Sequence, residues 1–301
     1  MGKDSHIEWT HSTFSVWEGC EKVSPACKNC YAETRAIRFG HGGKSGVHLP
    51  LWGPDSVRKF RSERYWNQPR RWNREAEAAG ERHRTFCMSL GDLFEILPDT
   101  NPNTPAMVEA RERLWKLIEE TPFLDWLLLT KRPENIDGLM PARWRAAGSW
   151  PFNVWLGATV ESQEYAEKRL PVLLRQPAAI HFLSCEPLLE NIDLGAWIHD
   201  IDWLIGGGES GADARPTKIE WARSLRDQAV AANKPYLWKQ WGMWKPHIEM
   251  SDEDKAKFAN AQTLFEGEEL MVRVNNKKEA CRLLDGEDWT QYPTPSLPRA
   301  A

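Results

Sequence analysis

Short apolar runs alternate with helix-like stretches along most of this chain, and each run ends in glycine, proline or polar residues. Parallel strands need a crossover between them, which is usually a helix, so this alternation predicts βαβ units in one parallel sheet. The runs are continuously apolar, which is typical of strands that helices cover on both faces. The predicted strands are Thr13–Val16, Thr85–Leu90, Trp126–Thr130, Val154–Ala158, Ile180–Ser184, Trp203–Gly206 and Tyr236–Lys239.

The seven predicted strands favour a barrel over a Rossmann sheet. No dinucleotide-binding glycine fingerprint follows the first predicted strand. We therefore expect an α/β fold, a partial or full (β/α) TIM-like barrel of parallel strands. The predicted helices are Thr104–Glu120, Glu134–Ala147, Glu161–Arg175 and Lys218–Ala232, preceded by a first helix from Cys27 to about Arg38.

The chain length suits one large domain with appendages. It has 301 residues, of which 41% are hydrophobic, enough for one substantial core. We expect the barrel over residues 1–242, with an Arg-rich insertion at about 40–84. Residues 243–301 turn polar and charged and are expected to form an extension, which ends in the Pro-rich stretch TQYPTPSLPRAA.

Composition indicates a cytoplasmic protein. No apolar run approaches the roughly 18 residues of a membrane span, and the first residues, MGKDSHIEWTHS, lack a secretory apolar stretch. Six cysteines in such a chain argue against a disulfide framework, because the cytosol keeps thiols reduced. Clustered thiols in that compartment indicate a metal or catalysis.

Three of the cysteines follow the first predicted strand with the spacing Cys20-x6-Cys27-x2-Cys30. Thiolates are soft ligands that favour iron–sulfur clusters and zinc. Three thiolates leave one iron of a [4Fe–4S] cluster without a protein ligand, so a substrate or cofactor can bind there. The alternative is structural zinc, with His41 or His48 as a fourth ligand.

Polar residues gather where the predicted strands end. In a parallel barrel these ends lie on one face, where the active site is found. The thiol of Cys185 is either a hydrogen-atom relay or a small buried hydrophobe, and Glu186 and Lys239 are candidates to line a substrate pocket. The strand-end stretches are Ser89–Asp92, Thr130–Pro133, Ala158–Glu161, Ser184–Pro187, Gly206–Ser210 and Lys239–Gly242.

An Arg-rich segment departs from the overall charge of −4. From Arg58 to Arg84 there are eight Arg and one Lys against four Glu, a net +5, and Phe60, Tyr65, Trp66 and Trp72 lie among them. Such a segment either tracks phosphates and stacks bases, or is a solvated helical insertion whose aromatic side chains pack on the barrel.

Eight segments, taken in order over about residues 7–242, resemble the phage-associated three-cysteine-motif proteins, which are radical-SAM-like. They are IEWT, GCEKVSPACKNCYAE, LGDLFE, LLTKRPENI, WLGATVES, LSCEPLLENI, LIGGGESG and WKQWG. The first cysteine gap here is six residues, where the commonest radical-SAM spacing has three, and Asn29 replaces the aromatic residue usual before the last cysteine.

The resemblance implies a [4Fe–4S] cluster on Cys20, Cys27 and Cys30 that binds S-adenosylmethionine, with an external electron donor. One-electron reduction would then yield a 5′-deoxyadenosyl radical that takes hydrogen from the substrate. By resemblance, Gly91 and Asp92 receive the cofactor ammonium, Lys131 or Arg132 its carboxylate, and Thr159 and Glu161 its ribose. The further implied cofactor-binding residues are Tyr31, Gly206, Gly207, Gly208 and Glu209.

We therefore expect a radical S-adenosylmethionine enzyme, encoded by a phage in a bacterial host, that modifies a nucleobase, nucleotide or nucleic acid. A hypermodified thymidine in phage DNA is one such target. One alternative is a zinc-stabilised nucleic-acid-binding module without catalysis. Another is a cluster-bearing partner of a second protein, contacted through the charged C-terminal tail.

Overall fold

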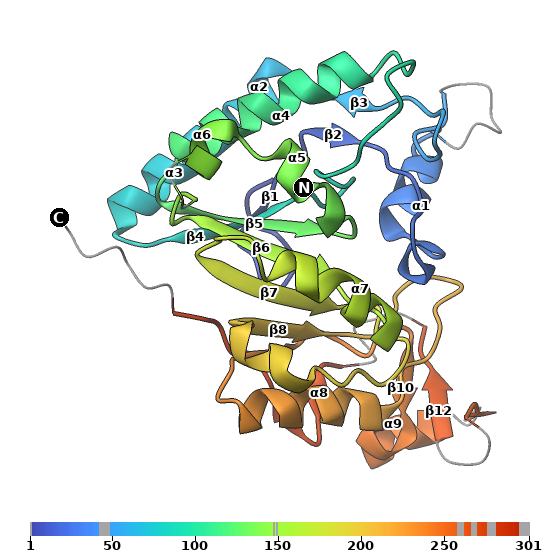
Figure 1. Ribbon diagram of the computed structural model, residues 1–301. Coiled ribbons are helices and arrows are strands. Elements are labelled where there is room, and N and C mark those ends of the chain that lie inside the picture. Colours follow the sequence, from blue (N-terminus) through green and yellow to red (C-terminus); the bar gives the residue numbers. More distant parts are fainter. Residues whose placement is uncertain are drawn as a thin grey trace. The chain divides into compact units, whose positions relative to one another are not determined.

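The computed structural model describes residues 2–41, 49–146, 148, 150–257, 262–265, 270–275 and 281–294. It contains a seven-stranded parallel sheet that curls as a partial β/α barrel (Figure 1). The expected α/β fold with a partial barrel of parallel strands is therefore confirmed. In sheet order the strands are β1 (Ser12–Thr13), β4 (His83–Cys87), β5 (Leu124–Thr130), β6 (Val154–Thr159), β7 (Ile180–Cys185), β8 (Trp203–Gly206) and β9 (Tyr236–Trp238).

Chain contacts divide the protein into two compact units, which we describe separately. Unit 1 comprises residues 1–158, 172–181 and 295–301, and unit 2 comprises residues 159–171 and 182–294. In the part of the chain that the structure describes, no helix is long and apolar enough to cross a membrane.

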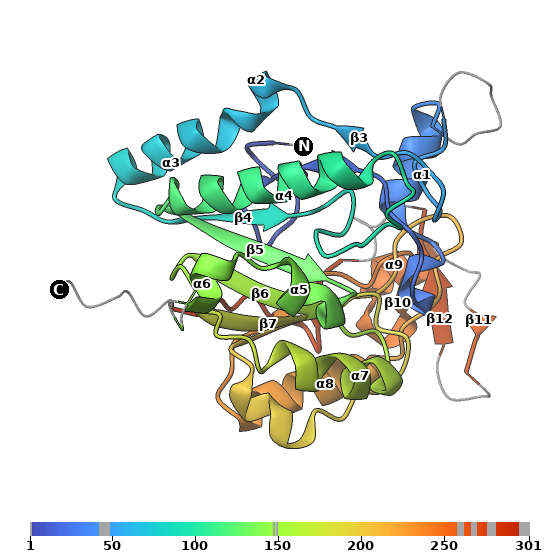
Figure 2. The same ribbon diagram turned by 45° about the horizontal axis from the view of Figure 1, so that its top comes forward.

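The strands of unit 1 are apolar because helices cover them. In β5 nearly every side chain is buried, including Trp126 and the run Leu127–Leu128. Figure 2 shows α3 and α4 running beside β4 and β5. The helices of unit 1 are α1 (Tyr31–Arg38), α2 (Glu63–Trp66), α3 (Gln68–Ala79), α4 (Thr104–Glu119), α5 (Ile136–Leu139) and α6 (Ala142–Ala146).

Local signals set the ends of these helices. Helix α3 begins next to Pro69, whose missing N–H is not needed in a first turn, and ends at Gly80 with φ +67°. The predicted helix Glu134–Ala147 is wrong as one element. It is η2 (Pro133–Asn135) followed by α5 and α6, because Pro141 cannot donate to a continuous helix. Its last residue, Ala147, lies outside the described residues.

The start of the chain also differs from expectation. The predicted strand Thr13–Val16 is shorter and earlier, as β1, and the chain then forms β2 (Trp17–Glu18), which pairs with β3 (Lys59–Phe60). The predicted first helix is interrupted, since η1 (Pro25–Cys27) ends before α1 begins at Tyr31.

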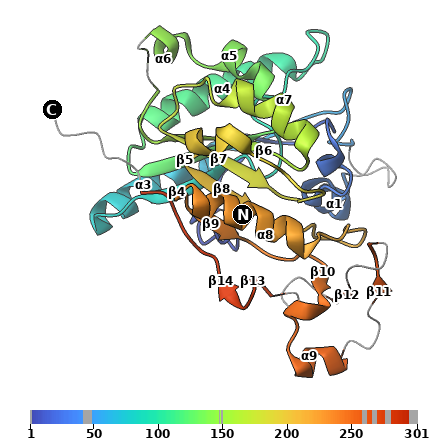
Figure 3. The ribbon, with the colours of Figure 1, turned by 60° about the horizontal axis from the view of Figure 1, so that its bottom comes forward.

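In unit 2, helix α8 (Ile219–Ala231) packs on β8 and β9 (Figure 3). Helix α7 (Gln163–Leu173) begins in this unit. Smaller elements follow β9, and Trp244 and Met271 form a satellite core with Ala214. The elements after β9 are β10 (Trp244–Pro246), η4 (His247–Glu249), α9 (Asp252–Lys257), β11 (Gln262–Thr263), β12 (Leu270–Arg273), β13 (Leu283–Leu284) and β14 (Glu287–Asp288). The short helix η3 (Gly195–Asp200) lies between β7 and β8.

The described end of the chain pairs with the last strand of the sheet. Trp238 N donates to Trp289 O at 2.9 Å, and Gln291 N donates to Tyr236 O at 3.1 Å. Leu237 and Thr290 form an antiparallel bridge. The polar region after residue 242 is therefore partly built into the sheet, because it covers the backbone of β9. Residues 295–301 of the predicted extended tail lie outside the described residues.

Candidate functional site

The first of the three clustered cysteines is held by backbone contacts. Cys20 N donates to Leu51 O at 3.2 Å, and Gly53 N donates to Cys20 O at 3.0 Å. Gly19 precedes it with φ +121°, and a Cβ there would lie 2.6 Å from Leu51 O, so only glycine fits. These contacts fix Cys20 beyond the carboxyl end of β1.

The other two cysteines lie further along the same loop, at the end of η1 and directly before α1. Cys27 ends η1 and is buried, with its Sγ 3.9 Å from Ser24 Oγ. Cys30 is the N-cap residue of α1 and is half-buried. None of the three forms a disulfide.

A buried guanidinium lies beside Cys20. Arg132, after β5, has Nη1 3.6 Å from Cys20 Sγ and donates through Nη2 to Glu21 O at 2.8 Å. Desolvation of the Cys20 thiol, with the charge of Glu95 next, raises its pKa, and the charge of Arg132 opposes this shift.

Asp92 is occupied by internal contacts. Its Oδ1 accepts from Thr130 Oγ1 at 2.7 Å and Phe94 N at 3.0 Å, and its Oδ2 accepts from Lys131 N at 2.9 Å and Arg132 Nη1 at 3.1 Å. Burial disfavours the charged carboxylate, but Arg132 and these hydrogen bonds outweigh burial and hold the pKa of Asp92 below its usual value. The contacts favour a role in holding β5 and Arg132 over an open ammonium site.

Glu95 is a second buried carboxylate, which the sequence analysis does not predict. Glu95 pairs with Arg58 through Nε at 2.8 Å and Nη2 at 2.9 Å, and it also accepts from Glu21 N at 2.8 Å. The side chains of Arg58 and Glu95 are 0% and 1% exposed. The one sequence signal was an acid inside the apolar stretch around Phe94 and Leu97.

The remaining predicted residues of unit 1 lie near this network. Tyr31 is exposed, and its hydroxyl donates to Ser89 O at 2.5 Å. A Cβ on Gly91 would lie 2.8 Å from Gly19 O, so glycine there permits close packing against the cysteine loop. Lys131 is half-buried, and its backbone donates to Asp92.

In unit 2, Glu161 forms a buried ion pair with Arg169, which also binds the backbone of Thr159. Glu161 Oε2 lies 2.7 Å from Arg169 Nη1, which also donates to Thr159 O at 2.7 Å. The Glu161 side chain is fully buried. Their contacts tie the end of β6 to α7.

A polar pair stands at the ends of β7 and β9. Lys239 Nζ donates to both oxygens of Glu186, at 2.6 and 2.8 Å, and Gln240 Nε2 lies 3.3 Å from Glu186 Oε1. Both Glu186 and Lys239 are half-buried, so the pair is partly exposed to solvent. Cys185 is fully buried, and burial raises the pKa of its thiol to about 12, as for a packed thiol rather than a reactive one.

The glycine run after β8 is shaped by its own backbone. A Cβ on Gly208 would collide with Trp241 O, and one on Gly206 would lie 3.0 Å from the Trp238 ring. A Cβ on Gly207 would lie no closer than 3.4 Å to Glu186, an ordinary contact. Glu209 pairs with Arg215. Gly207 is therefore the position of this run where packing does not demand glycine.

The aromatic side chains of the Arg-rich segment pack inside unit 1, and several of its arginines form ion pairs. Trp66 and Trp72 are buried, and Phe60 and Tyr65 are half-buried. The cations Arg58, Arg61, Arg70, Arg71 and Arg82 each form an ion pair within unit 1. The aromatic side chains therefore pack as in the second interpretation, while Arg70 and Arg71 form their ion pairs at the surface, with 37% and 65% of their side chains exposed.

The comparisons with known proteins give a family and no closer relative. The sequence profile of a family described as "protein of unknown function (DUF5131)" matches residues 4–293. The chain belongs to this family. No curated protein and no solved structure matches the chain.

No preformed metal centre is found among the described residues of this DUF5131 chain. Among the described residues, no group of three or more His, Cys, Asp and Glu side chains is arranged to hold one metal ion. A mononuclear zinc site needs its ligands around one point, whereas each thiolate of an iron–sulfur cluster binds a different iron. Of the predicted zinc ligands, His41 Nε2 lies 3.4 Å from Lys59 Nζ, and His48 is outside the described residues.

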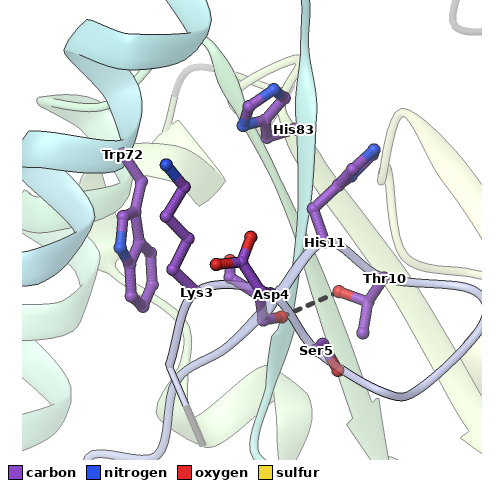
Figure 4. Close-up of a pocket in the computed structure, with 8 residues that line it drawn as sticks. Lys3, Asp4, Ser5, Thr10, His11, Trp72 and His83 are labelled. Atoms are coloured by element: carbon purple, nitrogen blue, oxygen red, sulfur yellow. Dashed lines mark hydrogen bonds between the residues drawn. The ribbon is translucent and has the colours of Figure 1, made fainter.

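A pocket elsewhere in unit 1 contains none of the predicted site residues (Figure 4). It lies at the amino ends of β1 and β4, where His11 and His83 stack with their ring centroids 4.9 Å apart. Burial, followed by the charge of Arg84, lowers the pKa of His11 to about 4. The lining residues are Lys3, Asp4, Ser5, Thr10, His11, Ser12, Trp72 and His83.

Proposed function

We propose that this protein is a radical S-adenosylmethionine enzyme whose [4Fe–4S] cluster is held by Cys20, Cys27 and Cys30. The observation that carries the proposal is the placement of the three thiols. They share one loop beyond the carboxyl end of a parallel strand, and none is used in a disulfide. In barrels of this class, that end of the sheet is where catalytic groups gather.

The thiol chemistry supports the assignment. Soft thiolate ligands suit iron–sulfur clusters, and three of them leave one iron open for a cofactor. The charged donor Arg132 beside Cys20 Sγ favours the thiolate form that ligation requires. When bound, the cluster and S-adenosylmethionine would supply one-electron cleavage of the sulfonium and a 5′-deoxyadenosyl radical, with the electron coming from an external donor.

The protein residues would then bind and orient the cofactor and the substrate. Of the cofactor residues implied by the resemblance, Tyr31 and Gly91 have surface to offer, whereas Asp92 and Glu161 are enclosed in ion pairs. Gly207 is buried. In unit 2 the pair Glu186–Lys239 offers one carboxylate and one ammonium at the ends of strands. These two groups are the proposed substrate-orienting pair.

The substrate we propose is a nucleobase or nucleotide, free or in a polymer. This part rests on the family resemblance. Mass spectrometry of nucleosides from host and phage DNA, with and without the protein, tests it. An unchanged nucleoside profile would move the substrate to another class of small molecule.

The catalytic part is tested by anaerobic reconstitution followed by a turnover assay with S-adenosylmethionine and dithionite. We expect formation of 5′-deoxyadenosine and methionine by the wild-type protein. Cys27→Ala should form neither, while Cys281→Ser, which changes a half-buried cysteine outside the loop, should match the wild type. A reconstituted wild-type protein that cleaves no cofactor would contradict the proposal.

A further inference from the structure

The loop that carries the three cysteines is anchored unevenly. Its first part is fixed at several points, since Cys20 is bonded to Leu51 and Gly53 and Glu21 is held at both its N–H and its C=O. Between Glu21 and η1 the side chains of Lys22 and Val23 are exposed. The extra length of the first cysteine gap therefore bulges outward after the anchored part.

The anchor is a chain of four buried charges. Arg58 pairs with Glu95, Glu95 lies 3.6 Å from Arg132 Nη2, and Arg132 pairs with Asp92. All four side chains are at most 7% exposed. Buried charges of both signs that are fully hydrogen-bonded define one geometry, because any displacement leaves a charge without its partner.

Two members of this chain grip the cysteine loop directly. Glu95 Oε1 accepts from Glu21 N at 2.8 Å, and Arg132 donates to Glu21 O at 2.8 Å while its Nη1 lies 3.6 Å from Cys20 Sγ. The planar guanidinium presents several donors in a fixed fork, so one residue can hold a carbonyl, a carboxylate and a sulfur together. A lysine offers one point charge and cannot reproduce that arrangement.

Cys27 and Cys30 are held by other means. Cys27 N donates to Ser24 O at 2.9 Å within η1, and Cys30 O accepts from Thr34 N at 3.0 Å in the first turn of α1. Neither contact involves the buried charges. The first cysteine is thus held by the backbone of residues 51–53 and by Arg132 after β5, and the other two are held by local helical geometry.

We propose that Arg132 is a positioning residue that fixes Cys20 independently of Cys27 and Cys30. Its partner is the thiol, and its role replaces the cofactor-carboxylate contact implied by the resemblance. The inference rests on the proposed function only for the meaning of the thiol as a cluster ligand. The contacts that place Cys20 are all formed by protein atoms.

The test uses amide hydrogen exchange of the metal-free full chain, followed by mass spectrometry of peptides. In Arg132→Met we expect residues 19–23 to exchange about tenfold faster, while residues 28–37 stay within about twofold of the wild type. The matched control is Arg82→Met, which removes another partly buried Arg–Asp pair of unit 1, at the amino ends of β4 and β5. It should leave both peptides unchanged. Equal acceleration of both peptides, or of neither, in Arg132→Met would overturn the proposal.

Arg132→Lys keeps the charge and covers the case in which Arg132→Met does not fold. We expect faster exchange of residues 19–23 in this variant too, because the fork is lost. After reconstitution, the cluster reduction potential should fall in Arg132→Met and lie nearer the wild-type value in Arg132→Lys, since a positive charge beside a ligand favours the reduced state. Identical reduction potentials in the wild type, Arg132→Met and Arg132→Lys would contradict the placement of Arg132 beside a cluster ligand. Failure to bind iron would count against the proposed function and leave the exchange result standing on its own.

Discussion

Arg58 and Glu95 form a two-point ion pair inside unit 1, with Nε–Oε2 and Nη2–Oε1 distances of 2.8 and 2.9 Å. The guanidinium also donates to the carbonyls of Leu51 and Ser56. One pair thus joins residues 51–58 to the strand-end segment that carries Asp92. It is the innermost support of the cysteine loop.

Removing one member of this pair should destabilise the protein. Glu95→Leu leaves the Arg58 charge buried without a partner, and we expect a loss of about 3–5 kcal/mol in the free energy of unfolding. Urea denaturation measures it. The control is Glu63→Gln, which breaks the exposed pair with Arg113 and should change stability little. Equal effects of the two substitutions would contradict the structural role given to Glu95.

Asp92 predicts an acid dependence of stability. Its pKa is lowered in the folded state from the model-compound value of 3.8, so its contribution is fully present above that value and is lost as the pH falls through the lower folded pKa. The free energy of unfolding should therefore fall more steeply below about pH 4 in the wild type than in Asp92→Asn. Parallel pH profiles of the two proteins would show that Asp92 is not held as an anion.

The glycine run offers a test that separates packing from cofactor approach. Gly208→Ala should destabilise the protein, since its Cβ would collide with Trp241 O, whereas Gly207→Ala should change the free energy of unfolding by less than about 0.5 kcal/mol. Thermal unfolding measures both. If Gly207 faces S-adenosylmethionine, Gly207→Ala should weaken cofactor binding while the melting temperature stays constant.

The end of the chain should protect the last strand of the sheet. Deleting residues 289–301 removes the pairing with β9 and exposes its backbone. We expect lower thermal stability and concentration-dependent association, because an uncovered strand edge invites pairing with another chain. Gln291→Ala, which removes one hydrogen bond to Tyr236 N, should cost only about 1 kcal/mol. A truncated protein as stable as the full chain would contradict this account.

The sheet was largely predictable because its signal is local. β8 matches the predicted strand at both ends. Helix α4 is one residue shorter than predicted at its C-terminal end, and α8 is one residue shorter at each end. The apolar run and the flanking turn residues suffice for such elements. The prediction failed where proline divided a helical pattern at Pro141, and where strand pairing with residues 59–60 drew out a second short strand.

The candidate site was less predictable because its contacts are distant in sequence. The cysteines stood out by spacing alone. The partnership of Arg132 with Cys20 joins residues 112 positions apart, and that of Arg58 with Glu95 joins residues 37 apart. No local pattern reports such pairs. The sequence marked Asp92 by its position after a strand, whereas its ion pair with Arg132 depends on neighbours that only the fold brings together.

The most direct test of the central claim is the iron and sulfide content of anaerobically reconstituted protein. The account predicts about four irons and four sulfides per chain for the wild type and for Cys281→Ser. Each of Cys20→Ala, Cys27→Ala and Cys30→Ala should lose most of both. Stoichiometric zinc without sulfide in the wild type, or a full cluster in all three alanine variants, would contradict it.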